Sequence, residues 1–181
     1  MLPEIRNMLK RSRLALLTTY IALWLGVALA AQAGEPEAYA VEFQVTLEPA
    51  RLGASVTMTV DRGELLKHIN FQNRNDSISA LKADGSLREK DGRVFWDLPN
   101  GRSTLSYFVR IPHERSPGKY DALINGDWAI FRGDDIIPAI HTKEVEGAYA
   151  ISTLAFVLPE GWKSVRTGWP RVEGNTFRID N

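Results

Sequence analysis

Residues 38–60 read AYAVEFQVTLEPARLGASVTMTV, and the alternation of apolar and polar side chains in this stretch decides the fold class. From 39 to 47 every second residue is apolar, which is typical of a strand with one face on a core and the other in water. Pro49 ends this run, and the alternation returns from Ala54 to Val60 before the turn at 61–63. The stretch therefore predicts two strands, 39–47 and 54–60, which are candidates for a hairpin.

The same period of two continues along the rest of the chain. Its clearest turn signal is Asp91-Gly92, because both residues tolerate positive φ and so favour a tight hairpin. No stretch has apolar spacing of about 3.6 residues over a length sufficient for a major helix. Turn signals about 8–12 residues apart predict an all-β fold, an antiparallel β-sandwich of about eight to ten strands. The further expected strands are 64–71, 78–84, 87–90, 93–98, 104–111, 148–158 and 176–179.

The composition limits the classes of function. The chain has 181 residues and no cysteine, which excludes a thiol nucleophile, a cysteine metal site and disulfides. The first 33 residues hold four of the 22 basic side chains and one of the 22 acidic ones, so residues 34–181 carry 18 and 21, a net charge of −3. A nucleic-acid partner normally needs a basic face. We therefore expect one domain, 34–181, and no nucleic-acid partner.

The first 33 residues have the pattern of a signal peptide. An uncharged apolar run from Leu14 to Ala31 follows a basic start, and Ala31-Gln32-Ala33 has the small residues that signal peptidase requires before Gly34. A retained membrane anchor is the alternative, because an uncharged run of 18 residues reaches the lower limit of a spanning helix. We favour a cleaved signal helix of the Sec type and a periplasmic or secreted protein, which would contact the membrane only through an uncleaved segment. The basic residues of the start are Arg6, Lys10, Arg11 and Arg13.

The irregular segment 113–140 is the place to look for a site, because functional residues concentrate on loops held by a scaffold. It contains a polar cluster, from which we name four candidate binding residues: Trp128, Arg132, Asp134 and Asp135. Together with Asp127, these carboxylates suit acid–base chemistry or Ca²⁺ binding. The favoured interpretation is structural, in which Arg132 pairs with a neighbouring aspartate. Apolar neighbours then fill the core: Trp128, Ile130, Phe131, Ile136 and Ile137.

No catalytic or metal-binding motif is complete. His113-Glu114 begins like the zinc-protease motif H-E-x-x-H, but the fifth position is Pro117 and we expect the segment to form a turn. His68 and His141 have no spaced partner and are expected to be surface or hydrogen-bonded histidines. G-x-S-x-G is also absent from the sequence. We therefore name no catalytic residue and no metal ligand, and expect no cofactor in this chain.

A set of short motifs resembles one known family. The motifs are Ser79–Gly85 with Val94-Phe95-Trp96, then Leu105–Val109, Leu158-Pro-Glu-Gly-Trp162 and Gly174–Phe177. Their succession resembles the N-terminal β-domain of M61-like peptidases, the glycyl aminopeptidases, over most of residues 39–181. In that family a catalytic domain with a zinc-binding H-E-x-x-H and a downstream glutamate follows in the chain. Neither feature is present here, so the resemblance carries over no catalytic residue and whether the protein acts as an enzyme stays open.

The resemblance implies that this chain is the non-catalytic part of a peptidase. Zinc is expected only in the absent catalytic domain, and the chain, which ends at Asn181 directly after an expected strand, is expected to be part of a longer protein. The first hypothesis is an exported, non-catalytic β-domain that packs on and shapes the substrate cleft of an M61-like zinc metallopeptidase. The alternative is a free-standing periplasmic β-module that binds a peptide or a protein partner. A small hydrolase built on the aspartate cluster is a third hypothesis.

Export can be tested directly. In a Gram-negative host we expect the protein in the periplasm with Gly34 as its first residue, because the cleavage pattern ends at Ala33. Intact-mass measurement and N-terminal sequencing of the periplasmic fraction check this. A membrane-bound product that retains residues 1–33 would support the anchor instead.

Overall fold

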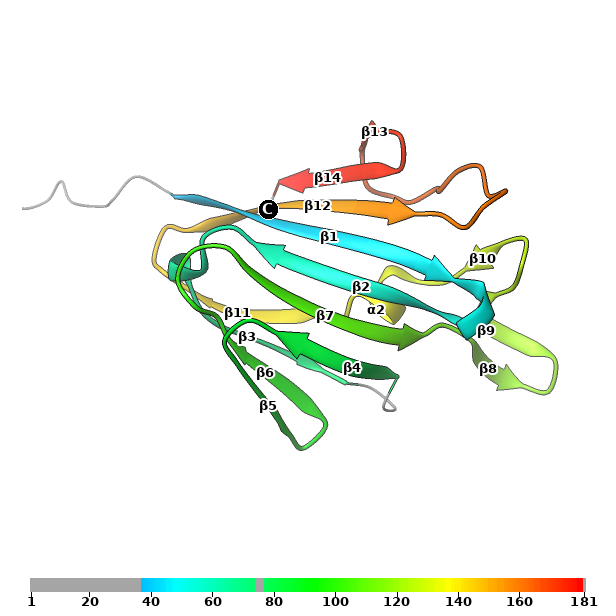
Figure 1. Ribbon diagram of the computed structural model, residues 1–181, viewed down its shortest axis with the longest axis horizontal. Coiled ribbons are helices and arrows are strands. Elements are labelled where there is room, and N and C mark those ends of the chain that lie inside the picture. Colours follow the sequence, from blue (N-terminus) through cyan, green and yellow to red (C-terminus); the bar gives the residue numbers. More distant parts are fainter. Residues whose placement is uncertain (1–36, 74–76, 181) are drawn as a thin grey trace, which may run out of the picture. The chain divides into compact units, whose positions relative to one another are not determined.

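The computed structural model describes residues 37–73 and 77–180, and the expected signal helix lies outside them. Within these residues 14 strands form three sheets of seven, four and three strands (Figure 1). The elements in chain order are β1 (Ala38–Glu48), η1 (Pro49–Arg51), β2 (Gly53–Val60), η2 (Gly63–Leu65), β3 (Leu66–Gln72), β4 (Ile78–Ala83), β5 (Ser86–Lys90), β6 (Arg93–Asp97), β7 (Ser103–Arg110), β8 (His113–Ser116), β9 (Lys119–Ile124), β10 (Ala129–Ile130), α2 (Gly133–Ile136), β11 (Ile140–Glu144), β12 (Tyr149–Val157), β13 (Arg171–Glu173) and β14 (Thr176–Asp180).

The seven-stranded sheet is built on residues 38–60, which form β1 and β2. β1 and β2 form the expected antiparallel hairpin, joined through η1 and Leu52, which adopts a left-handed conformation with φ of 53°. The strand order is β13-β14-β12-β1-β2-β7-β4. β1 and β12 run parallel, with Phe43 beside Leu154, so the expectation of a wholly antiparallel sandwich is wrong at this pair. Parallel pairing requires a long crossover, which the other two sheets supply here.

The four-stranded sheet has the order β11-β3-β6-β5. The hairpin predicted at Asp91-Gly92 is confirmed: β5 and β6 pair antiparallel, and the two turn residues have φ of 53° and 69°. The smallest sheet, β10-β9-β8, follows β7 in the chain.

The two larger sheets enclose one core. The predicted inward residues of β1 and β2 are buried, as are Leu105, Tyr107 and Val109 of β7. From the four-stranded sheet, Phe71 meets Tyr107 with ring centroids 6.3 Å apart, and Trp96 is fully buried with its Nε1 donating to the Asp84 carbonyl. Burial of each such large side chain contributes about 1.5–3 kcal/mol. The all-β fold is therefore confirmed.

The strand count and the irregular segment differ from expectation. The described residues hold 14 strands instead of eight to ten, because segment 113–140 contains β8, β9, β10 and the start of β11. These strands have two to six residues each, too few for a period of two to show in the sequence. One four-residue helix, α2, also lies in this segment. No helix in the described part of the chain is long and apolar enough to cross a membrane.

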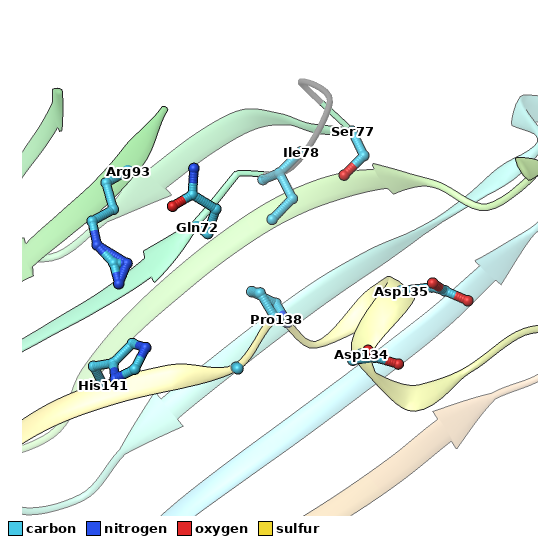
Figure 2. Close-up of a pocket in the computed structure, with 9 residues that line it drawn as sticks. Gln72, Ser77, Ile78, Arg93, Asp134, Asp135, Pro138 and His141 are labelled. Atoms are coloured by element: carbon cyan, nitrogen blue, oxygen red, sulfur yellow. The ribbon is translucent and has the colours of Figure 1, made fainter. Parts of the chain in front are cut away.

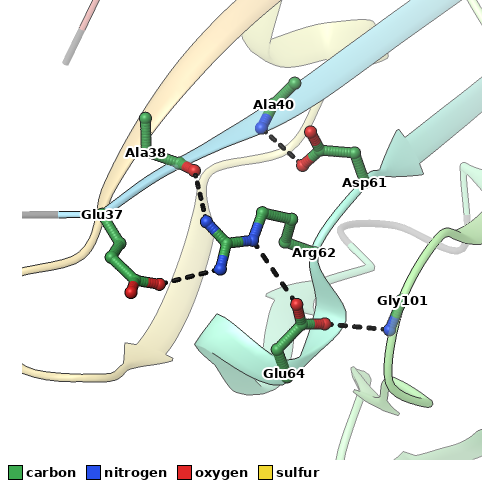
Figure 3. Close-up of polar contacts among 7 residues, drawn as sticks. All are labelled: Glu37, Ala38, Ala40, Asp61, Arg62, Glu64 and Gly101. Atoms are coloured by element: carbon green, nitrogen blue, oxygen red, sulfur yellow. Dashed lines mark hydrogen bonds and ion pairs between the residues drawn. The ribbon is translucent and has the colours of Figure 1, made fainter.

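Arg62 ties the start of β1 to two connections (Figure 3). Its Nη2 lies 2.8 Å from Glu37 Oε2, and its Nε lies 3.4 Å from Glu64 Oε1. The second oxygen of Glu64 accepts a hydrogen bond from the Gly101 N–H at 2.9 Å, and this bond lowers the pKa of Glu64. All three charged groups are exposed, so water screens the ion pairs and their main effect is to fix geometry.

Asn73 joins β3 to β4 through a buried pair of hydrogen bonds. Its Nδ2 donates to the Ile78 carbonyl and its Oδ1 accepts from the Ile78 N–H, each at 3.0 Å. The backbone N–H of Asn73 donates to the Gly92 carbonyl at 2.8 Å. The side chain is 8% exposed, so water cannot readily replace these partners.

Replacing Asn73 with alanine should destabilise the domain markedly. Both polar groups of Ile78 would lose their partners, and we expect the free energy of unfolding to fall by about 2–3 kcal/mol. The matched control is Asn70→Ala, whose exposed Nδ2 donates to the His141 carbonyl at 3.3 Å; its expected cost is below about 1 kcal/mol. Urea unfolding followed by tryptophan fluorescence measures both. Equal losses in the two variants would contradict the proposed role of the buried pair.

Candidate functional site

The predicted polar cluster forms a self-contained turn, here called the aspartate turn (Arg132, Asp134 and Asp135). The guanidinium of Arg132 makes two hydrogen bonds to Asp134, at 2.9 and 2.6 Å. Asp135 Oδ2 accepts from the backbone N–H of Arg132 at 2.8 Å and so caps α2. Both carboxylates therefore have structural partners, as the structural interpretation of this cluster expected.

Trp128 lies apart from the aspartate turn. Asn125 Oδ1 accepts from the backbone N–H groups of Asp127 and Trp128, at 2.8 and 3.0 Å, and holds a tight turn before β10. The expectation that Trp128 and Ile130 fill the core is wrong, because their exposed fractions are 48% and 63%. Of the five apolar residues expected in the core, the other three pack inward, with Ile136 buried and Phe131 and Ile137 partly buried.

Asp134 and Asp135 border a polar groove of about 370 Å³ (Figure 2). Across the groove from them stand Arg93 of β6, His141 of β11 and Gln72 of β3. Arg93 and Gln72 were not predicted as site residues. They lie side by side because β3 pairs with β6, and no turn signal in the sequence reveals this pairing. The groove therefore carries basic groups on one side and carboxylates on the other.

The three histidines lie on two sheets: His113 is in β8, whereas His68 and His141 are in the neighbouring strands β3 and β11, two positions apart in register. His113 Nδ1 lies 3.5 Å from Asp121 Oδ2 on the exposed face of the smallest sheet, and His141 lines the polar groove. The expectation of a turn at His113–Ser116 is wrong, since these residues form β8. Among residues 37–73 and 77–180, no three His, Asp or Glu side chains gather in the manner of metal ligands.

Two apolar grooves open beside β12. The first, here called the lateral groove, has a volume of about 530 Å³ and lies between β1 and β12 on one side and β3 and β11 on the other. The second, the end groove, has about 610 Å³ and lies between β12, the β10–α2 segment and residues 162–168. Ile137 lines both grooves. Trp169 lines the lateral groove and Trp162 lines the end groove.

A polar contact closes one end of the lateral groove. The hydroxyl of Tyr39 donates to Glu144 Oε1 at 2.5 Å, and the Thr142 hydroxyl donates to the same oxygen at 2.9 Å. Burial raises the pKa of Tyr39 well above its usual range, and the bond to Glu144 adds to the effect. The phenol therefore stays protonated and keeps this contact at all physiological pH values.

Three apolar residues, Trp128, Ile130 and Trp162, are here called the aromatic surface: Ile130 and Trp162 line the end groove, and Trp128 lies with Trp162 in a neighbouring shallow groove. The indole N–H of Trp162 donates to the Gly126 carbonyl at 2.9 Å, which fixes the ring beside the Asn125 turn. Trp128 and Trp162 together line a shallow groove of about 370 Å³, with Asp127 and Lys163 at its rim. Large exposed apolar groups with a polar rim are typical of surfaces that another molecule covers.

Comparison with known proteins finds similarity in structure but not in sequence. No protein-family profile and no curated protein sequence matches the chain. The aminopeptidase N family protein from Idiomarina loihiensis is similar in structure, with a TM-score of 0.59 and 19% sequence identity over 78% of this chain. The match covers 27% of that protein, so the chain spans about a quarter of its length. This domain therefore has the fold of one part of an aminopeptidase N family protein, in agreement with the resemblance to the peptidase β-domain drawn from the sequence motifs.

Proposed function

We propose that this chain is an exported, non-catalytic β-domain that packs on an M61-like zinc metallopeptidase domain and shapes its substrate cleft. The observation that carries the proposal is the fold similarity to one quarter of an aminopeptidase N family protein. The carboxylates of the aspartate turn are occupied by Arg132 and by the cap of α2, which leaves the chemistry to the partner domain. Zinc would then belong to that domain, bound by an H-E-x-x-H motif and a downstream glutamate.

The aromatic surface is the proposed contact with the catalytic domain. Its two most exposed members, Trp128 and Ile130, have exposed fractions of 48% and 63%. Tryptophan is enriched at the centres of protein interfaces, where surrounding polar groups exclude water. Asp127 and Lys163 occupy such a rim position here.

A polypeptide that carries the H-E-x-x-H motif tests this function. It is sought in the coding DNA beyond codon 181 and in neighbouring genes, then purified with and without residues 37–180. We expect zinc-dependent hydrolysis of glycyl and alanyl anilides, with kcat/KM lower by about tenfold or more without this domain, because a displaced cleft wall misplaces the substrate. Equal activity of the two preparations, or the lack of any such polypeptide, would count against the proposal.

The uncovered aromatic surface should make the chain alone self-associate. We expect dye binding in the folded state and dimers or larger species at micromolar concentration, measured by light scattering. Trp128→Ser with Ile130→Ser should reduce both signals by about half or more. Val172→Ser is the matched control, because Val172 of β13 has the same exposed fraction as Ile130, 63%. If Val172→Ser has the same effect as the double variant, this surface has no special role.

A second candidate function is a peptide-binding β-module. It is favoured by an unpaired strand edge beside an apolar groove, on the side of the four-stranded sheet where β11 lies. This arrangement leads to the inference below.

A further inference from the structure

The two large sheets end at different places on the side of β12. The seven-stranded sheet continues past β1 into β12, β14 and β13, whereas the four-stranded sheet ends at β11. The lateral groove lies where the smaller sheet stops. Apolar side chains of both sheets reach it without complete cover, among them Ile140 of β11 and Ala150 of β12, which are only partly buried.

β11 is an edge strand along this groove. Within the described residues it pairs with β3 and with no strand on its other side. A free edge carries unpaired N–H and C=O groups, which are a template for another extended chain. The ligand that fits such an edge is a polypeptide in the β conformation, because only that conformation presents groups at the matching spacing of about 3.3–3.4 Å per residue.

The side chains of β11 define what that polypeptide should contain. Ile140, Thr142 and Glu144 line the lateral groove, and His141 and Lys143 alternate with them along the strand. Ile140 is partly buried, and the other four residues of β11 are exposed. Residues of an added strand alternate in the same way, so every second side chain would enter the groove and the others would lie beside His141 and Lys143. Apolar groups suit the groove, and carboxylates suit the two basic side chains.

Glu144 does not oppose this arrangement. One of its carboxylate oxygens already accepts hydrogen bonds from Tyr39 and Thr142, at the end of the groove. The opposite edge of the same sheet lacks this groove, because no residue of β5 lines it. The two edges of one sheet therefore provide a test and its control.

We propose that the free edge of β11 binds an extended polypeptide segment that alternates apolar and acidic residues. The segment adds a strand to the four-stranded sheet and places its apolar side chains in the lateral groove. This inference develops the second candidate function, and it holds or fails independently of any catalytic domain, because its ligand is bound by this chain alone.

The test uses the full chain and a fluorescein-labelled octapeptide of four Glu-Val repeats, with both ends blocked. We expect binding in the range of about 10–100 μM by fluorescence anisotropy, as for a weak peptide interaction. The control peptides are four Lys-Val repeats, which place the wrong charge beside Lys143, and a block of four Glu followed by four Val, which lacks alternation. Each should bind at least about tenfold more weakly, a difference of about 1.4 kcal/mol. Equal binding of the three peptides would overturn the proposal.

Charge-reversal variants locate the site. His141→Glu with Lys143→Glu should weaken binding of the Glu-Val peptide about tenfold or more and strengthen that of the Lys-Val peptide. Lys90→Glu on β5 should leave both affinities within about twofold. All three side chains are exposed, so the variants are expected to fold, and circular dichroism checks this. A Lys90→Glu effect equal to that of the double variant would assign the binding to general charge and overturn the proposal.

Hydrogen exchange tests whether a strand is added. Binding of the Glu-Val peptide should slow amide exchange in residues 140–144, because a newly paired edge hydrogen-bonds its backbone groups. Residues 86–90 of β5 should exchange at an unchanged rate. Slower exchange confined to β5, or no change in either strand at saturating peptide, would show that the peptide does not pair with β11.

Discussion

The structure depends on the two-sided pairing of β1. This strand pairs with β2 over residues 41–48 and with β12 over residues 38–46, so every residue of it has a partner and residues 41–46 have partners on both edges. Its inward residues are at the same time the most continuous part of the core. A strand paired on both edges and buried on one face has a single tolerable register, because a shift of one residue would turn its apolar side chains into water. β2, β7 and β12 then take their places relative to β1.

The parallel pair has a consequence for where function can lie. β12 comes late in the chain and pairs with β1, and β14 and β13 follow it in the seven-stranded sheet. The sheet therefore extends beyond β1 on a side where the four-stranded sheet ends at β11. Short segments close that side only partly: α2, the β10 turn and the loop before β13. The two apolar grooves beside β12 are the result. Both proposed binding surfaces lie beside these two grooves.

The aspartate turn and the surfaces around the grooves differ in where their polar and aromatic groups find partners. The charged groups of the aspartate turn form hydrogen bonds with one another and with the nearby backbone, between residues no more than three apart in the chain. Such short-range contacts shape a loop and contribute little energy when exposed. The strand edge of β11 and the exposed ring of Trp128 are different, because backbone edges and exposed rings gain most from a second molecule.

The sequence by itself determined the strands whose pattern is local. The alternation in 39–47, 54–60 and 104–111, and the Asp91-Gly92 turn, could be predicted because neighbouring residues decide strand faces and tight turns. The pairing of Arg132 with a nearby aspartate was predictable for the same reason. The five strands shorter than five residues or without alternation could not be found in this way, nor could the exposure of Trp128 and Ile130.

Only the tertiary structure decided how the strands meet. The parallel β1–β12 pair, the Gln72–Arg93 register and the free edge of β11 each join residues far apart in the chain. No turn or period in the sequence encodes these contacts, because many pairings of amphipathic strands bury similar apolar area and the choice among them depends on the whole fold. The sequence thus specified which faces are buried, and the tertiary structure specified which edge and which grooves remain open.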